Sequence, residues 1–116
     1  MPIQLSGPYT FNPQTVDQKI AHTYPGVYAL GYTSILGHFV TERVGRSDSD
    51  LNARLKSDEY KGKYSQFMAA YVLTADEAYH AECELYHVHG GPNNPNHPAV
   101  PWGKTLKCKH CKHPWY

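Results

Sequence analysis

The pattern of apolar and polar positions predicts three strands in the middle of the chain. Residues 26–35, GVYALGYTSI, are rich in β-branched and aromatic side chains and predict a strand. Gly37 predicts a turn, after which the alternating residues 38–45, HFVTERVG, predict the second strand of a hairpin. Residues 67–74, FMAAYVLT, are apolar almost throughout, which predicts a third strand in a central position.

Two helices are predicted around the third strand. The polar run SDSD precedes a short helix over 50–56, in which two leucines recur four residues apart. Thr74, followed three residues later by Glu77, forms a capping box for a helix over 75–89 that ends at a Gly-Gly pair. The order of elements predicts an α+β fold: a small, mainly antiparallel three-stranded sheet flanked by helices.

The two ends of the chain differ from its middle. Residues 1–23 contain three prolines and scattered apolar positions, so we expect an irregular N-terminal arm with a short helical turn over 14–21. Residues 24–98 form the predicted domain. Residues 99–116 form a tail that holds a Cys-Lys-His-Cys motif and little else that could pack.

Composition and charge narrow the class of protein. With 116 residues and 41% hydrophobic residues, the chain predicts one globular domain rather than a disordered one. A net charge of +1 means that a nucleic acid would have to be bound by a local patch of charge. The start of the chain lacks a leader pattern, and no window approaches the roughly 20 apolar residues of a membrane span. We therefore expect a soluble, cytoplasmic protein without a membrane partner.

Three side chains have the chemistry that phosphodiester cleavage requires. Tyr28 falls on the first predicted strand, Arg54 on the short helix and Glu82 on the last helix. A guanidinium holds phosphate charge, a carboxylate binds a hard divalent cation, and a phenol can orient or deprotonate water. Each residue also has an ordinary interpretation, namely a strand tyrosine, a solvated arginine and a solvated glutamate.

Five short motifs, in order and at similar spacing, make residues 25–98 resemble the GIY-YIG nuclease superfamily. The motifs are PGVY (25–28), RVGRS (43–47), DLNARL (50–55), DEAYHAECELYH (76–87) and the asparagine Asn94 in NNPNHP. The resemblance implies a GIY-YIG-type sheet and a metal-dependent endonuclease. Tyr28 would help to activate water, Arg54 would stabilise phosphate charge, and Glu82 would bind one Mg²⁺ or Mn²⁺. Asn94 would order the glutamate helix and the loop behind it, with Asn93 and Asn96 open as alternative counterparts.

The second motif departs from the family at Arg43, which stands where the family has a tyrosine. Arg43 binds phosphate in its place, or another residue fills the role, or catalysis is weakened. The candidates for a replacement are Tyr32, Tyr60 and His38. Arg46 would lie near the nucleic-acid backbone.

A second group of residues predicts a structural zinc site. Cys108 and Cys111 form a CxxC motif, while Cys83 and His87 are four residues apart on one face of the last helix. Together they would form a closed site that attaches the tail to the helix. Other nitrogen ligands in place of His87 remain open: His89, His97, His110 and His113. Cys83 could also be an ordinary buried cysteine, and the CxxC a disordered tail or a redox pair.

The sequence therefore predicts an endonuclease acting on nucleic acid, with DNA as the first candidate, and a homodimer or a partner protein is plausible. The alternatives are a catalytically weakened or inactive nucleic-acid-binding module and a zinc-stabilised protein-interaction domain. Salt-dependent binding without cutting separates the first alternative from the nuclease. Zinc without DNA binding would indicate the second.

Overall fold

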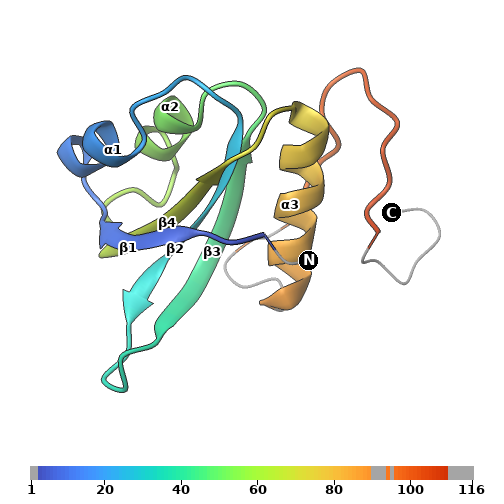
Figure 1. Ribbon diagram of the computed structural model, residues 1–116. Coiled ribbons are helices and arrows are strands. Elements are labelled where there is room, and N and C mark those ends of the chain that lie inside the picture. Colours follow the sequence, from blue (N-terminus) through green and yellow to red (C-terminus); the bar gives the residue numbers. More distant parts are fainter. Residues whose placement is uncertain (1–2, 90–93, 95, 110–116) are drawn as a thin grey trace.

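The computed structural model, which describes residues 3–89, 94 and 96–109, contains a four-stranded antiparallel sheet in the order β1-β4-β2-β3 (Figure 1). The strands are β1 (Ser6–Thr10), β2 (Gly26–Thr33), β3 (Phe39–Ser47) and β4 (Gln66–Tyr71). The predicted α+β class and antiparallel pairing are confirmed. The predicted number of three strands is wrong, because the N-terminal arm adds β1 to the sheet.

The N-terminal arm is ordered by aromatic packing. Tyr9 on β1 lies opposite Phe67 on β4, and the ring centroids of these two residues are 5.5 Å apart. The Phe11 ring packs edge-on against Phe67 at 5.8 Å. Asn12 then caps helix α1 (Pro13–Lys19) by accepting a hydrogen bond from the Thr15 N–H at 2.8 Å. The expectation of an irregular arm is therefore wrong for β1, whereas the helical turn expected over 14–21 corresponds to α1.

The helices cover both faces of the sheet. Helices α1 and α2 (Leu51–Lys56) lie on one face, and α3 (Ala75–Val88) lies on the other (Figure 1). Strand β2 alternates between the two cores: Tyr28 and Leu30 join the α1/α2 core, whereas Val27 and Ala29 join the α3 core. Because β2 is buried on both faces, its sequence is apolar rather than alternating.

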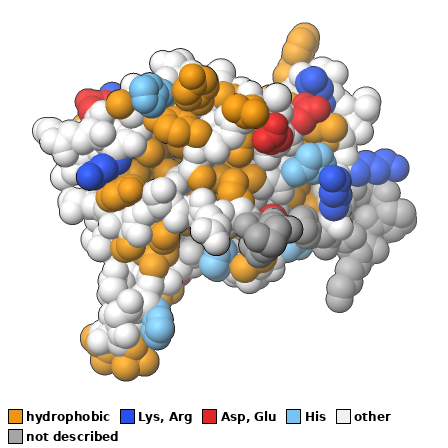
Figure 2. All heavy atoms as spheres, viewed as in Figure 1, with side chains coloured by type: hydrophobic (Ala, Val, Ile, Leu, Met, Phe, Trp, Pro, Cys, Tyr) orange, Lys and Arg blue, Asp and Glu red, His pale blue; other side chains and the backbone are white. Residues whose placement is uncertain are grey.

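The tail runs back along α3 (Figure 1). Cys108 is buried against Tyr79 and Cys83 on that helix, with Leu106 packed beside them. At the opposite end of the molecule, the β2–β3 hairpin projects beyond β4 and exposes Ile35 and Leu36 at its tip (Figure 2). Among the helices of the described residues, none combines the length and apolarity needed to cross a bilayer.

Candidate functional site

Tyr28 lies on the α1/α2 face of β2, where its side chain is fully buried. It is paired with Gly45 on the neighbouring strand β3. A Cβ atom at Gly45 would overlap the phenol ring and hydroxyl of Tyr28. The glycine of the RVGRS motif is thus required because the Tyr28 ring lies directly across the backbone at that position.

A buried carboxylate, Asp58, gathers the polar groups around Tyr28. The Tyr28 hydroxyl donates to Asp58 Oδ2, and the Tyr60 backbone N–H donates to Oδ1 at 2.8 Å. Arg43 Nε lies 3.1 and 3.2 Å from the two carboxylate oxygens, and Arg54 Nη1 lies 3.3 Å from Oδ2. Asp58 was not predicted, because it stands in a short polar stretch that has the composition of a solvated loop.

The electrostatics of this cluster fix its protonation. Burial alone would raise the pKa of Asp58, but hydrogen bonds from Tyr28 and the Tyr60 N–H, together with the charge of Arg43, leave it below its usual value. Burial raises the pKa of the Tyr28 phenol far above its ordinary range; Arg54 opposes this shift, and Asp58 adds to it. At neutral pH a protonated phenol therefore donates to an ionised carboxylate.

Arg43, which was predicted to bind the nucleic acid, is buried inside this cluster. Besides Asp58 it contacts Glu59 at 3.3 Å, and its guanidinium lies 4.4 Å from the centre of the Tyr60 ring. Of the three candidates for the missing tyrosine, Tyr60 is thus in contact with Arg43. Tyr32 is exposed on the projecting part of the hairpin, and His38 follows the hairpin turn. A role for Arg43 in phosphate binding remains a prediction.

Glu82 lies on α3, across strand β3 from Tyr28. Its carboxylate is buried, and its Oε1 accepts a hydrogen bond from Arg46 Nη1 at 2.8 Å. Arg46 Nε also contacts Asp48 Oδ1 at 2.8 Å. Burial raises the pKa of Glu82, while the positive charges of Arg46 and Arg54 act in the opposite direction. Glu82 is thus within the electrostatic reach of Arg54, although its direct contact is with Arg46.

The predicted catalytic residues therefore flank the edge strand β3. On the α2 side, the Arg54 guanidinium lies 5.7 Å from the centre of the Tyr28 ring. On the α3 side, Glu82 is held by Arg46, the residue that follows Gly45. The three groups therefore form two contact clusters on opposite faces of the sheet, one on each side of strand β3.

Asn94 contacts the same strand from the loop after α3. Its Nδ2 donates to the Val44 carbonyl oxygen at 2.8 Å, and the Val44 N–H donates to its Oδ1 at 3.0 Å. We call this pair of hydrogen bonds the Asn94 clamp. The clamp gives hydrogen-bond partners to the outward-facing N–H and carbonyl of Val44 on the edge strand β3. It thereby occupies a position in which a further strand could pair.

Cys83, His97 and Cys108 form a group that can bind a metal ion, since one donor atom from each lies within 4.8 Å of the others. The structure brings together the two predicted cysteines Cys83 and Cys108, with His97, one of the open alternatives, as a nitrogen donor. Burial raises the pKa of the Cys83 thiol, so metal binding would have to displace its proton.

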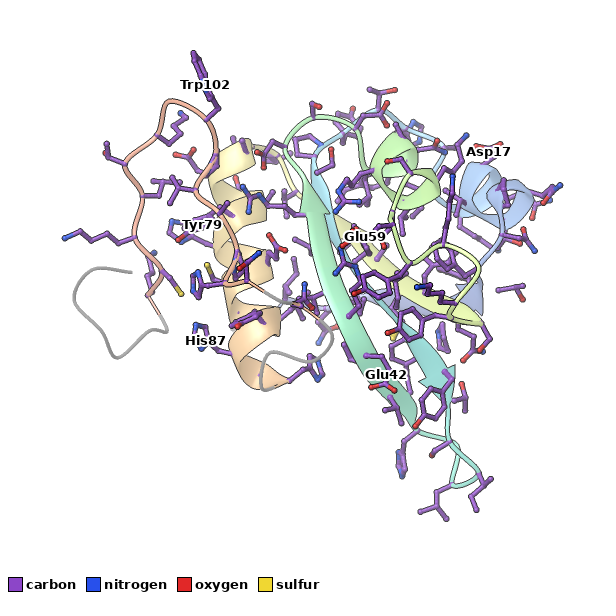
Figure 3. All side chains as sticks on the ribbon, turned by 180° about the vertical axis from the view of Figure 1, so that it is seen from behind. Asp17, Glu42, Glu59, Tyr79, His87 and Trp102 are labelled. Carbon is purple, nitrogen blue, oxygen red and sulfur yellow. The ribbon has the colours of Figure 1, made fainter. Side chains whose placement is uncertain are left out.

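Of the remaining predicted ligands, His87 and His89 lie among the described residues. His87 is on α3, and its Nε2 lies 3.4 Å from His97 Nε2. Figure 3 shows His87 and Tyr79 on the side of α3 along which the tail runs. His89 is exposed at the end of the helix. Three candidates fall outside the described residues: Cys111, His110 and His113.

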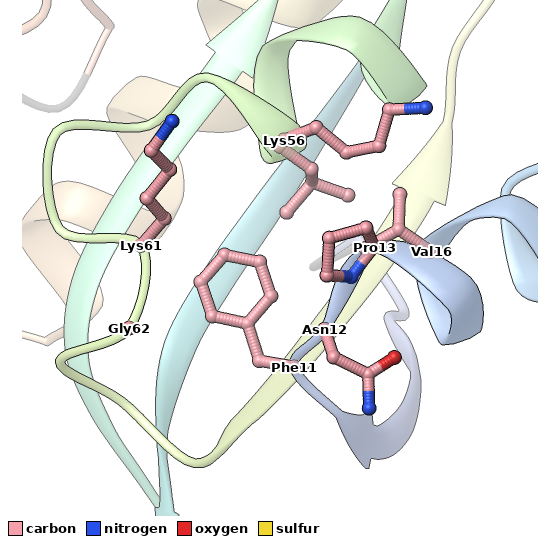
Figure 4. A pocket seen from close by; sticks show the side chains of 8 residues that line it. Phe11, Asn12, Pro13, Val16, Lys56, Lys61 and Gly62 are labelled. Atoms are coloured by element: carbon pink, nitrogen blue, oxygen red, sulfur yellow. The ribbon is translucent and has the colours of Figure 1, made fainter.

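An apolar hollow lies between α1, α2 and the following loop (Figure 4). It has a volume of about 350 Å³ and is lined by Phe11, Pro13, Val16 and Leu55, with Lys56 and Lys61 at its rim. It contains none of the predicted site residues.

Comparison with protein-family models, curated proteins and solved structures gave no match to this chain. The resemblance to the GIY-YIG nucleases therefore rests on the motifs of the sequence.

Proposed function

We propose that the chain is a GIY-YIG-type, metal-dependent endonuclease that hydrolyses phosphodiester bonds in nucleic acid, with DNA as the expected substrate. The observation that carries the proposal is the packing of Tyr28 against Gly45 and Arg54, with Glu82 on the other side of strand β3. Motifs far apart in the sequence thus meet around one strand, which supports the proposal.

Glu82 is the proposed ligand of Mg²⁺ or Mn²⁺. A hard divalent cation prefers oxygen ligands, and the carboxylates of Glu82 and Asp48 would supply them. Arg46 now bridges the two carboxylates and would have to move aside. The bound ion would supply polarisation of the phosphate and stabilisation of the leaving oxygen.

The contacts refine the proposed role of Tyr28. Its hydroxyl donates to Asp58, so the phenol can take a proton from water only if its own proton passes to that carboxylate. Because the pKa of Asp58 is lowered and that of the Tyr28 phenol is raised, this transfer is unfavourable. In the proposed site Asp58 therefore orients Tyr28, which keeps its proton and would help to position the water. Arg54, which contacts Asp58 and lies over the Tyr28 ring, would stabilise charge on the phosphate.

Metal-dependent cleavage tests the proposal directly. Purified protein with Mg²⁺ or Mn²⁺ is expected to nick plasmid DNA or to cut branched or single-stranded DNA. Glu82→Ala should abolish the cleavage, whereas Glu77→Ala, an exposed glutamate on the same helix, should leave it intact. Absence of metal-dependent cleavage on all these substrates and on RNA would refute the nuclease.

A second candidate function is a nucleic-acid-binding module or adaptor without activity. It is favoured by Arg43, which replaces a tyrosine and engages Asp58 inside the fold. This alternative predicts salt-sensitive binding that is weakened by Arg46→Ala or Arg54→Ala, with no cleavage in either divalent metal.

We also propose that the ion at Cys83, His97 and Cys108 is a structural zinc. Thiolate and imidazole are the ligands that zinc prefers in closed tetrahedral sites. The ion would attach the tail, which has few apolar residues, to helix α3. Elemental analysis should find about one zinc per chain. Metal-free protein with the same thermal stability before and after chelation would contradict the proposal.

A further inference from the structure

We infer that the proposed zinc site is closed by a second imidazole, His87, and that the closed site holds the Asn94 clamp on the edge of the sheet. The inference rests on the zinc proposed above and does not depend on nuclease activity. The ligand set would then be two thiolates and two imidazoles, all from described residues: Cys83, His87, His97 and Cys108.

The spacing of the two imidazoles carries the first step. His87 Nε2 and His97 Nε2 are 3.4 Å apart. Zinc–nitrogen bonds of about 2.0–2.1 Å at the tetrahedral angle place two nitrogen ligands about 3.3 Å apart. The pair therefore already has the separation that one zinc ion imposes on two nitrogen ligands. His87 lies outside the group of donor atoms that are within 4.8 Å of one another, so its imidazole would have to turn toward the two thiols when the ion binds.

The tautomer of His97 fits the same assignment. Its Nδ1 lies 2.9 Å from the carbonyl oxygen of Pro98, which can only accept, so Nδ1 carries the proton. Nε2 then presents its lone pair on the side of His87. A backbone carbonyl that fixes the second nitrogen of a histidine is the common orienting contact of zinc ligands. Cys83 and His87, four residues apart on α3, project from one side of the helix.

Two of the proposed zinc ligands lie close in sequence to residues that contact strand β3. Cys83 directly follows Glu82 on α3, and His97 lies three residues after Asn94 in the loop. Asn94 holds Val44, which stands between Arg43 and Gly45. A single ion would thus tie the helix of the carboxylate to the loop that clamps the strand, and its loss would release the clamp.

Cobalt substitution of the full-length protein tests the ligand set. The wild type, Cys111→Ser and His89→Ala should each bind about one ion with the absorption of tetrahedral Co²⁺. His87→Ala should lose that absorption, and His87→Cys should keep it and add thiolate–cobalt charge transfer, which separates loss of a ligand from loss of fold. If Cys111→Ser loses the spectrum while His87→Ala keeps it, the inference is wrong and the zinc proposal survives. Failure of the wild type to bind metal refutes both.

Amide hydrogen exchange tests the link to the clamp. In zinc-loaded protein the Val44 amide should be protected, and removal of zinc should accelerate its exchange by about tenfold or more relative to the amides of the central strand β2. Asn94→Ala should accelerate Val44 exchange while zinc remains bound. Unchanged Val44 exchange after zinc removal, or equal acceleration throughout β2, would overturn the link.

Discussion

The close approach of Tyr28 to Gly45 shows how one residue pair fixes the geometry of the candidate site. The phenol lies across the glycine, which brings its hydroxyl to Asp58 at the start of the loop after α2. Gly45 lies inside β3 and is not among the glycines with positive φ, so no sharp turn of the backbone explains it. That a glycine is needed here could be predicted from the sequence. Its cause could not, because the partner that demands it is seventeen residues away (45 − 28) and is brought beside it by strand pairing.

Gly45→Ala should destabilise the protein by about 1–3 kcal/mol, the usual cost of overpacking a buried site. Urea unfolding of the variant and of the wild type measures this difference. The cost should be smaller in a Tyr28→Phe background, because the hydroxyl that the new methyl group overlaps is absent there. An equal cost in both backgrounds would contradict the assigned contact with the hydroxyl.

Asp58 should give the fold an acid-sensitive component of stability. Its pKa is lowered on folding, so the ionised form stabilises the fold above the unfolded value of about 3.9, and this contribution is lost as the pH falls through the folded value. Unfolding free energies measured from pH 6 to pH 2 should therefore decline at the acid end. Asp58→Asn should flatten that decline and cost about 3–5 kcal/mol at neutral pH, because buried Arg43 is left with only the exposed carboxylate of Glu59.

At the scale of the elements, the strands that could be predicted from the sequence are those buried in the sheet. Strands β2 and β4 are paired on both sides, and their apolar sequences predicted them. Strand β1 is a largely exposed edge strand of five residues that contains Gly7 and Pro8, so neither periodicity nor propensity distinguishes it from a loop. Tertiary packing of Tyr9 on Phe67 makes it a strand, and such packing is not encoded locally.

The predicted start of α3 illustrates a local signal that is sufficient by itself. Thr74 Oγ1 accepts a hydrogen bond from the Glu77 N–H at 3.1 Å, as the capping box implies. Thr74→Ala should lower the free energy of unfolding by about 1 kcal/mol, measured by denaturant titration. Thr23→Ala, at an exposed position before β2, should change it by less than about 0.5 kcal/mol. Equal effects of the two substitutions would show that the cap contributes nothing.

At the scale of the whole molecule, the candidate site is assembled across the two faces of the sheet. Long-range contacts complete it: Asp58 with Tyr28, Asn94 with Val44, and His97 with Cys83. The motifs identified most of these residues as candidates, but their partners could not be predicted. Asp58 and His97 lie in polar segments where the sequence offers no periodicity, so only the fold selects them from their neighbours.

The charges of the assembled site predict how it should bind nucleic acid. Its three arginines each contact a carboxylate: Arg43 and Arg54 share Asp58, while Arg46 bridges Glu82 and Asp48. These contacts and a net charge of +1 leave little positive charge to attract phosphates. Without divalent metal we therefore expect weak DNA binding, with a slope of log K against log salt no steeper than about −3, since about 0.9 counterions are released per phosphate contact.

Addition of Mn²⁺ should strengthen this binding, because a divalent ion at Glu82 would reverse the local balance of charge and displace Arg46 toward the phosphates. Fluorescence anisotropy of labelled DNA across a salt series, with and without Mn²⁺, measures both effects. Glu82→Gln should remove the enhancement by Mn²⁺ without weakening the metal-free binding, whereas Glu77→Gln should change neither. Tight, metal-independent binding with a salt slope far steeper than about −3 would mean that nucleic acid is bound elsewhere on the molecule. The edge of β3 would then not be the phosphate-binding site.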